Sequence, residues 1–132
     1  EETMLRTTFS ENLFNKIKPI NLEKSLKIGD EISGHFVYGH VDRITKLLKI
    51  SKLNNSWEFF FENFQNKDNN YIVKKASIAI NGISLTIANV TNEYFSISVI
   101  PHTFDNTNLS DLQECDVVNI EFDYLARFGE RK

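Results

Sequence analysis

The residues S-I-A-I-N-G-I-S-L-T-I-A-N-V, at positions 77–90, decide the fold class of this 132-residue chain. Apolar and β-branched residues are frequent on both sides of Asn81-Gly82, a dipeptide that adopts positive φ readily and is typical of two-residue hairpin loops. The stretch therefore predicts an antiparallel hairpin of two strands, Ser77–Ile80 and Ile83–Val90.

Strand patterns continue on both sides of this hairpin. Apolar and polar residues alternate in Phe95–Val99 and, in part, in Trp57–Glu62, where Trp57, Phe59 and Phe61 share one face. Short strands at close spacing, without a long helix between them, predict an all-β antiparallel barrel or sandwich. The remaining expected elements are strands at Glu31–Val41, Arg43–Leu53 and Cys115–Asp123, a helical turn or strand start at Tyr71–Lys75, and the start of a helix in Leu125–Lys132.

The composition limits the classes of function. With 15 basic and 18 acidic residues, the net charge is −3, which argues against nucleic acid as the main partner because that affinity depends on neutralising phosphates. No run approaches the roughly 18 apolar residues of a membrane span, and the polar N-terminus is no signal peptide. A single cysteine excludes an internal disulfide framework and suits a reducing, cytoplasmic compartment.

The stretch S-G-H-F-V-Y-G-H-V-D, residues 33–42, contains two of the three histidines. On a regular strand, a separation of five places His35 and His40 on opposite faces. The third histidine, His102, and the only cysteine, Cys115, lie far along the chain, so the residues predict no metal site.

Each of these two histidines follows a glycine, Gly34 or Gly39. Glycine within a strand marks a bulge or the close approach of a ligand or another backbone. The segment is therefore either a curved barrel strand or the wall of a pocket, and by itself it favours the curved strand.

A repeat connects the two ends of the chain. Thr3–Glu11 resembles Thr103–Asp111 at an offset of 100 residues, and Ile20–Glu23 resembles Val118–Glu121 at an offset of 98. The order of the two matches predicts that the chain begins near the end of one barrel and continues through a second. The expected division is residues 1–20 as the tail of a preceding, absent barrel and linker, 21–124 as a barrel, and 125–132 as a C-terminal helix start or tail.

Several of these motifs together resemble the second barrel of the riboflavin synthase α chain family, and the resemblance covers nearly the whole chain. Two departures are Asn81, where the family commonly has aspartate, and Ser33, where it has glycine; most of a first barrel is also missing. The motifs are S-G-H-F-V-Y-G-H-V-D (33–42), S-I-A-I-N-G-I-S-L-T (77–86), V-I-P-H-T-F (99–104), V-N-I-E-F-D (118–123), I-N-L-E (20–23) and the opening E-E-T-M-L-R-T-T (1–8).

The resemblance implies a six-stranded antiparallel Greek-key barrel that belongs to a tandem pair. It also implies the last step of riboflavin biosynthesis, in which two molecules of 6,7-dimethyl-8-ribityllumazine exchange a four-carbon unit and give riboflavin and 5-amino-6-ribitylamino-pyrimidinedione. The reaction needs no cofactor because the substrate is its own electron sink. Family members form homotrimers, with each active site between the first barrel of one subunit and the second barrel of another.

The resemblance further implies roles for individual residues. His40, Ser84 and Asp123 are expected to be catalytic, with His40 as a proton carrier or as the electrostatic partner of a substrate anion; His35 is expected to be structural. Glu2 and Thr3 are remnants of a first-barrel site. The expected substrate-binding residues are Gly39, His40, Val41, Lys75, Gly82, Ile83, Ser84, Thr86, Ser98, Val99, Ile100, Pro101, His102 and Thr103.

Two other classes stay open. A non-catalytic lumazine or flavin carrier of the antenna type would have the same fold and pocket. A nucleic-acid-binding Greek-key barrel is supported only by the stripe of Trp57, Phe59 and Phe61, which is more typical of a core than of a ligand platform.

Overall fold

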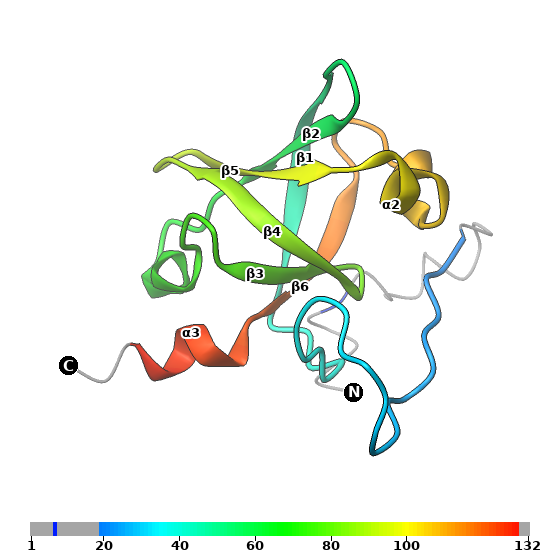
Figure 1. The fold of residues 1–132 in the computed structure, drawn as a ribbon. Coiled ribbons are helices and arrows are strands. Elements are labelled where there is room, and N and C mark those ends of the chain that lie inside the picture. The colour runs from blue at the N-terminus through cyan, green and yellow to red at the C-terminus, as the bar shows by residue number, and fades with distance from the viewer. Residues whose placement is uncertain (1–6, 8–18, 130–132) are drawn as a thin grey trace.

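In the computed structural model, which describes residue 7 and residues 19–129, six strands form one closed antiparallel barrel (Figure 1). Around the barrel the order is β1-β2-β5-β4-β3-β6. The predicted all-β fold is therefore confirmed, with a barrel instead of a sandwich. The strands are β1 (Arg43–Lys52), β2 (Trp57–Glu62), β3 (Ser77–Ile80), β4 (Ile83–Val90), β5 (Tyr94–Val99) and β6 (Val117–Phe122).

The connections have Greek-key topology. β3, β4 and β5 follow one another as hairpin neighbours, whereas the chain from β2 makes a long connection before β3, and β2 pairs with β5. β6 then closes the barrel between β3 and β1. Three consecutive strands, β3, β4 and β5, followed by β6 beside the first of them, form a Greek key.

The hairpin predicted from Asn81-Gly82 is present. Ile80 pairs with Ile83, and the two loop residues have φ of 50° and 80°. Two successive positive φ angles are those of a type I′ turn, whose twist matches that of the strands it joins.

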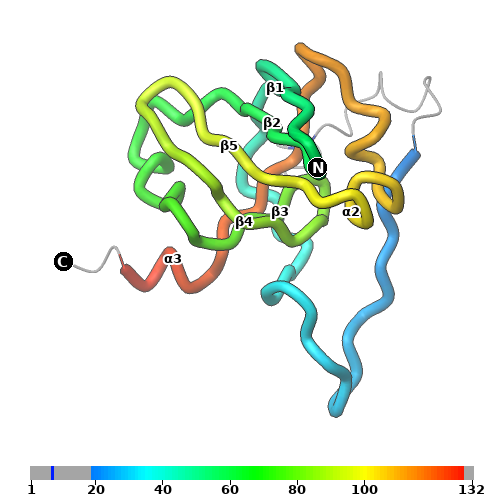
Figure 2. The backbone as a smooth tube through the Cα atoms, turned by 45° about the horizontal axis from the view of Figure 1, so that its top comes forward, coloured from blue at the N-terminus to red at the C-terminus, as the bar shows by residue number. Residues whose placement is uncertain are grey.

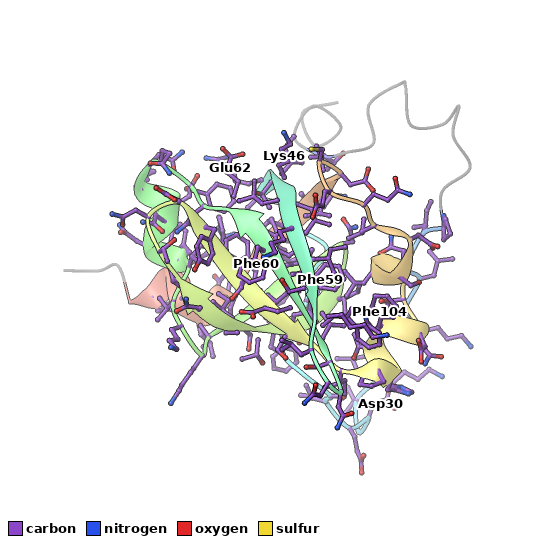
Figure 3. All side chains as sticks on the ribbon, turned by 90° about the horizontal axis from the view of Figure 1, so that it is seen from above. Asp30, Lys46, Phe59, Phe60, Glu62 and Phe104 are labelled. Carbon is purple, nitrogen blue, oxygen red and sulfur yellow. The ribbon has the colours of Figure 1, made fainter. Side chains whose placement is uncertain are left out.

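Aromatic residues fill the barrel interior. Phe59 and Phe61 of β2 are fully buried, and Trp57 stacks on Phe104 of α2 (Pro101–Asp105) with ring centroids 4.0 Å apart. Phe59 and Phe104 lie near one another, while Phe60 belongs to the outer face of β2 (Figure 3). The aromatic stripe is thus core, and the one feature in favour of nucleic-acid binding is removed.

The expected strand at Glu31–Val41 was wrong. Within the described residues this segment has no regular secondary structure, and the chain before β1 loops away from the barrel and returns across it (Figure 2). Gly34 and Gly39 have φ of 91° and 73°, and these left-handed conformations interrupt an extended strand. The glycines therefore redirect the chain.

Short helices complete the fold. The 3-10 helix η1 (Lys67–Tyr71) ends at the first residue of the segment expected as a helical turn or strand start, and residues 72–75 are neither helix nor strand. The 3-10 helix η2 (Asn108–Asp111) follows α2. The helix expected from residue 125 begins one residue earlier, as α3 (Tyr124–Phe128).

The first residues of the repeat lie largely outside the described part of the chain. Ile20–Glu23 has no regular secondary structure, whereas its counterpart Val118–Glu121 belongs to β6. The Asn21 amide donates to the Asn81 carbonyl at 3.0 Å and to Asn108 Oδ1 at 2.8 Å. These bonds attach the segment before the barrel to the β3–β4 turn and to η2.

Candidate functional site

A row of outward-facing residues crosses three neighbouring strands. The register pairs Ser84 of β4 with Ala79 of β3, and Ala79 with Glu121 of β6. Because strands lie about 4.8 Å apart, Ser84 and Glu121 are separated by roughly 10 Å along this row. Ala79 and Glu121 are nevertheless buried, so another part of the chain must cover the row.

Residues 33–41, which we call the arm, cover this row. At one end the His35 N–H donates to Ser84 Oγ at 3.2 Å. Further along, the Tyr38 N–H donates to Glu121 Oε1 at 2.6 Å. The arm thus crosses the strands by hydrogen bonds from its backbone to outer-face side chains.

Gly34 allows this crossing. An added Cβ at Gly34 would lie 2.3 Å from Ser84 Oγ and 2.7 Å from Ser84 Cβ. Since such contacts are sterically forbidden and the φ of Gly34 is also positive, glycine meets two requirements of this position.

His35 contacts Ser84 a second time through its side chain. Its Nδ1 lies 2.7 Å from Ser84 Oγ. The other ring nitrogen, Nε2, is buried and has no hydrogen-bond partner among the residues that the structure describes. His35 is therefore held at Ser84 through both main chain and side chain.

Next to the covered row runs a second outer row that is more open. Ser77 pairs with Thr86, and extending the β4–β5 register by one residue sets Thr86 beside Ser98. Thr86 and Ser98 are exposed and Ser77 is partly so. Three hydroxyls on adjacent strands form a surface that can both donate and accept hydrogen bonds, as a polyol requires.

The end of the arm borders a hollow of about 400 Å³. The Tyr38 ring lies against the rings of His40 and Tyr124, with centroids 6.2 and 5.8 Å away. All three of these side chains are largely exposed. The hollow is lined by Tyr38, Gly39, His40, Val41, Asp42, Glu121, Phe122, Tyr124 and Arg127.

Asp42 ties this hollow to α3. Its carboxylate accepts from the Phe122 N–H at 2.9 Å and forms an ion pair with Arg127. The hydrogen bond with Asp42 is the main cause that raises the pKa of Arg127. Arg127 lies in the last turn of α3, so this ion pair joins the end of the helix to Asp42 at the hollow.

The other expected substrate residues lie on or near the β3–β4–β5 side. Lys75 is exposed at a φ of 71° and its N–H donates to the Ile87 carbonyl at 2.9 Å. Gly82 is exposed in the turn and Ile83 packs partly against the core. Val99 is fully buried, so only its backbone is available to a ligand on the outer face.

The segment after β5 forms α2. Ile100 precedes the helix, Pro101 begins it, and His102 is exposed, while Thr103 is half-buried. Asp123 caps α3, its Oδ1 accepting from the Leu125 N–H at 3.0 Å. Glu2 and Thr3 lie outside the described residues.

The structure brings together some of the expected site residues and not others. Ser84 lies beside Thr86, Ser77 and Ser98, whereas no residue of β4 or β5 lines the hollow at His40. His35 is the histidine at Ser84, although the sequence favoured a structural role for it. Glu121 was missed; the signal for it was the only charged residue of the strand β6, at an outward position.

In residue 7 and residues 19–129, no three His, Cys, Asp or Glu side chains gather as a group that could hold a metal ion. No helix in that part of the chain is long and apolar enough to cross a membrane.

Comparison with known proteins first gives the class. Residues 38–123, from the arm to the end of β6, match the family model described as the lumazine binding domain. The chain belongs to this family of ligand-binding barrels.

Relatives among the curated proteins are more particular. A riboflavin synthase of Chlamydia trachomatis is 42% identical over 127 residues, covering 96% of this chain and 60% of that protein. One of Actinobacillus pleuropneumoniae is 35% identical over 130 residues, covering 98% and 59%. The chain thus spans about 60% of the length of these relatives.

Solved structures share the fold. LumP complexed with 6,7-dimethyl-8-(1'-D-ribityl) lumazine superposes with a TM-score of 0.71 at 20% identity, covering 91% of this chain and 63% of that one. LumP complexed with riboflavin gives a TM-score of 0.63 at 20% identity, covering 71% and 50%. At this identity the likeness concerns the fold.

Proposed function

We propose that this chain is a lumazine-binding barrel of a riboflavin synthase. In the proposed reaction, two molecules of 6,7-dimethyl-8-ribityllumazine exchange a four-carbon unit and yield riboflavin and 5-amino-6-ribitylamino-pyrimidinedione. The observation that most supports this proposal is the open row of hydroxyls on β3, β4 and β5. This row lies beside Ser84 in a barrel of the lumazine binding domain family. Riboflavin synthases at 35–42% identity support the activity.

The proposed reaction requires the protein mainly to position the two substrates and to stabilise the developing negative charge. The lumazine C7 methyl loses a proton because the ring delocalises the resulting negative charge, so the protein must orient two rings and direct donors at the anion. Ser84 is the donor nearest the open row. Thr86 and Ser98 are placed to bind ribityl hydroxyls.

His40 and Asp123 keep the catalytic roles predicted from the resemblance. His40 is exposed at the hollow, where an imidazole can exchange protons with solvent. If it carries the proton, His40→Ala in the full-length, two-barrel protein should lower turnover about ten- to a thousand-fold and affect binding less. Unchanged turnover would leave His40 as a wall residue.

Binding is tested by titrating the 132-residue chain with 6,7-dimethyl-8-ribityllumazine and following ligand fluorescence. We expect saturation at one ligand per barrel. The double variant Thr86→Val, Ser98→Ala should bind the ligand more weakly. The matched control is Thr45→Val, which alters a buried threonine of β1 instead of the open row. Absence of any change at high micromolar ligand would refute the proposal.

The second candidate is a non-catalytic lumazine or flavin carrier. It would share the binding result, so a second measurement is needed. Release of the pyrimidinedione from lumazine alone, detected chromatographically, distinguishes an enzyme from a carrier. The trimer and the cytoplasmic location remain predictions of the resemblance and the composition.

A further inference from the structure

Ser84 Oγ receives two contacts from one residue. The His35 N–H donates to it at 3.2 Å, and the His35 Nδ1 lies 2.7 Å away. A hydroxyl has one hydrogen to donate and two lone pairs to accept with. One lone pair of Ser84 Oγ therefore accepts from the His35 main chain. The tautomer of His35 decides whether the second lone pair accepts from Nδ1–H or the serine hydrogen donates to Nδ1.

The surroundings of Nε2 favour one tautomer. This atom is buried and has no partner among the described residues, and a buried N–H without an acceptor is rarer in proteins than a buried acceptor without a donor. The hydrogen of a neutral ring therefore belongs on Nδ1. In that form Nδ1–H donates to Ser84 Oγ and occupies its second lone pair.

From this geometry we propose that His35 is a positioning residue that makes Ser84 an obligate hydrogen-bond donor. With both lone pairs engaged by His35, the Ser84 hydroxyl can only donate, and its hydrogen points away from the arm. The inference rests on the proposed function, because its ligand is the lumazine that becomes an anion in the reaction. A donor that cannot turn into an acceptor favours the anion over the neutral ring.

Gly34 is part of the same arrangement. The arm approaches Ser84 so closely that a Cβ at this position would overlap Ser84 Oγ. Any larger residue must displace either the arm or the serine side chain. Gly34→Ala should therefore break both hydrogen bonds from His35 without changing a polar group.

The test uses side chains that copy one ring nitrogen each. In His35→Asn the amide nitrogen replaces Nδ1–H, in His35→Gln the longer amide reaches the position of Nε2, and His35→Leu removes both. The 132-residue chain and these variants are loaded with 6,7-dimethyl-8-ribityllumazine at one alkaline pH. The ratio of anionic to neutral bound ligand is then measured by absorption, with thermal melts to compare folding.

We expect Ser84→Ala to lower the ratio of anion to neutral ligand about 10- to 100-fold, the effect of losing one hydrogen bond to a charged group. His35→Leu and His35→Gln should cause most of the same loss, and His35→Asn should restore it. The double variant His35→Leu, Ser84→Ala should be no worse than Ser84→Ala alone, because His35 acts through the serine.

Three results would overturn the inference. They are an unchanged ratio in Ser84→Ala, equal ratios in His35→Leu and His35→Asn, and a double variant much worse than Ser84→Ala. Failure of the proposed function looks different, because the unaltered chain would then bind no lumazine in either form.

Discussion

At the scale of single residues, Asn81 is a position with positive φ that forms the turn between β3 and β4. Asn81 has a φ of 50° and receives a hydrogen bond from the Asn119 N–H at its Oδ1, 2.9 Å away. Its own N–H donates to the Asn119 carbonyl at 2.9 Å. The resemblance leads us to expect aspartate at this position, and the asparagine Oδ1 supplies an acceptor that aspartate would also have.

Replacement of Asn81 tests this account. Asn81→Ala removes the acceptor and places alanine in the left-handed region, so we expect a loss of about 1–3 kcal/mol in the free energy of unfolding, measured with urea. Asn81→Asp keeps the oxygen and tolerates the backbone angle, so its loss should be clearly smaller. Equal losses in the two variants would contradict this role.

Two neighbouring phenylalanines provide a matched comparison of core and surface. Phe59 is fully buried, whereas Phe60 is half-buried and packs edge-on against Tyr94 with ring centroids 5.4 Å apart. We expect Phe59→Ala to lower the free energy of unfolding by about 3–5 kcal/mol. Phe60→Ala should cost much less in the same urea titration; the reverse order would mean that the register of β2 is wrong.

At the scale of elements, the arm matters most. It lacks a backbone ladder to any strand, and Glu121 accepts from its Tyr38 N–H. A buried carboxylate that receives an N–H contributes more than a neutral acceptor. Local opening of the arm should therefore depend on this side chain.

Hydrogen exchange of the Tyr38 amide measures that opening. We expect Glu121→Ala to speed exchange about 10- to 100-fold, the effect of removing a hydrogen bond to a charged group. Glu121→Gln retains an acceptor oxygen and should show a smaller increase. If Glu121→Ala leaves the Tyr38 amide as protected as before, another contact anchors the arm.

At the scale of the whole molecule, the chain is about 60% of the length of its riboflavin synthase relatives. The resemblance implies an active site shared between two unlike barrels, and positioning two reactants contributes on the order of 7–11 kcal/mol to such a reaction. We therefore expect the 132-residue chain to bind lumazine and form riboflavin only weakly. Adding a separately made first barrel should raise the rate, and full activity without it would exclude a shared site.

Much of the barrel followed from local pattern. The turn at Asn81-Gly82 and the inward position of Phe59 and Phe61 depend on backbone preference and on alternation between neighbours in sequence. The prediction of a strand at 31–41 was wrong because it also relied on local pattern. An apolar, aromatic run is typical of a strand, but glycine permits both a bulge and a change of direction.

The sequence proposed the residues of a candidate site, and these remain predictions, but it did not give their arrangement. Ser84 and Thr86 lie on the outer face of β4. The sequence ranked His40 above His35 because a regular strand would place His35 on the other face. Residue type and motif contain no information about which of the two histidines reaches Ser84.

The sequence by itself determined the hairpin at Asn81-Gly82, the buried stripe and the family to which the chain belongs, because each depends on residues close in the chain or on motifs in order. Only the tertiary structure decided that the arm lies across β4, β3 and β6. The contacts that hold it join residues 49 and 83 positions apart. Such contacts exist only after barrel closure has set the register that places Ser84, Ala79 and Glu121 in one row.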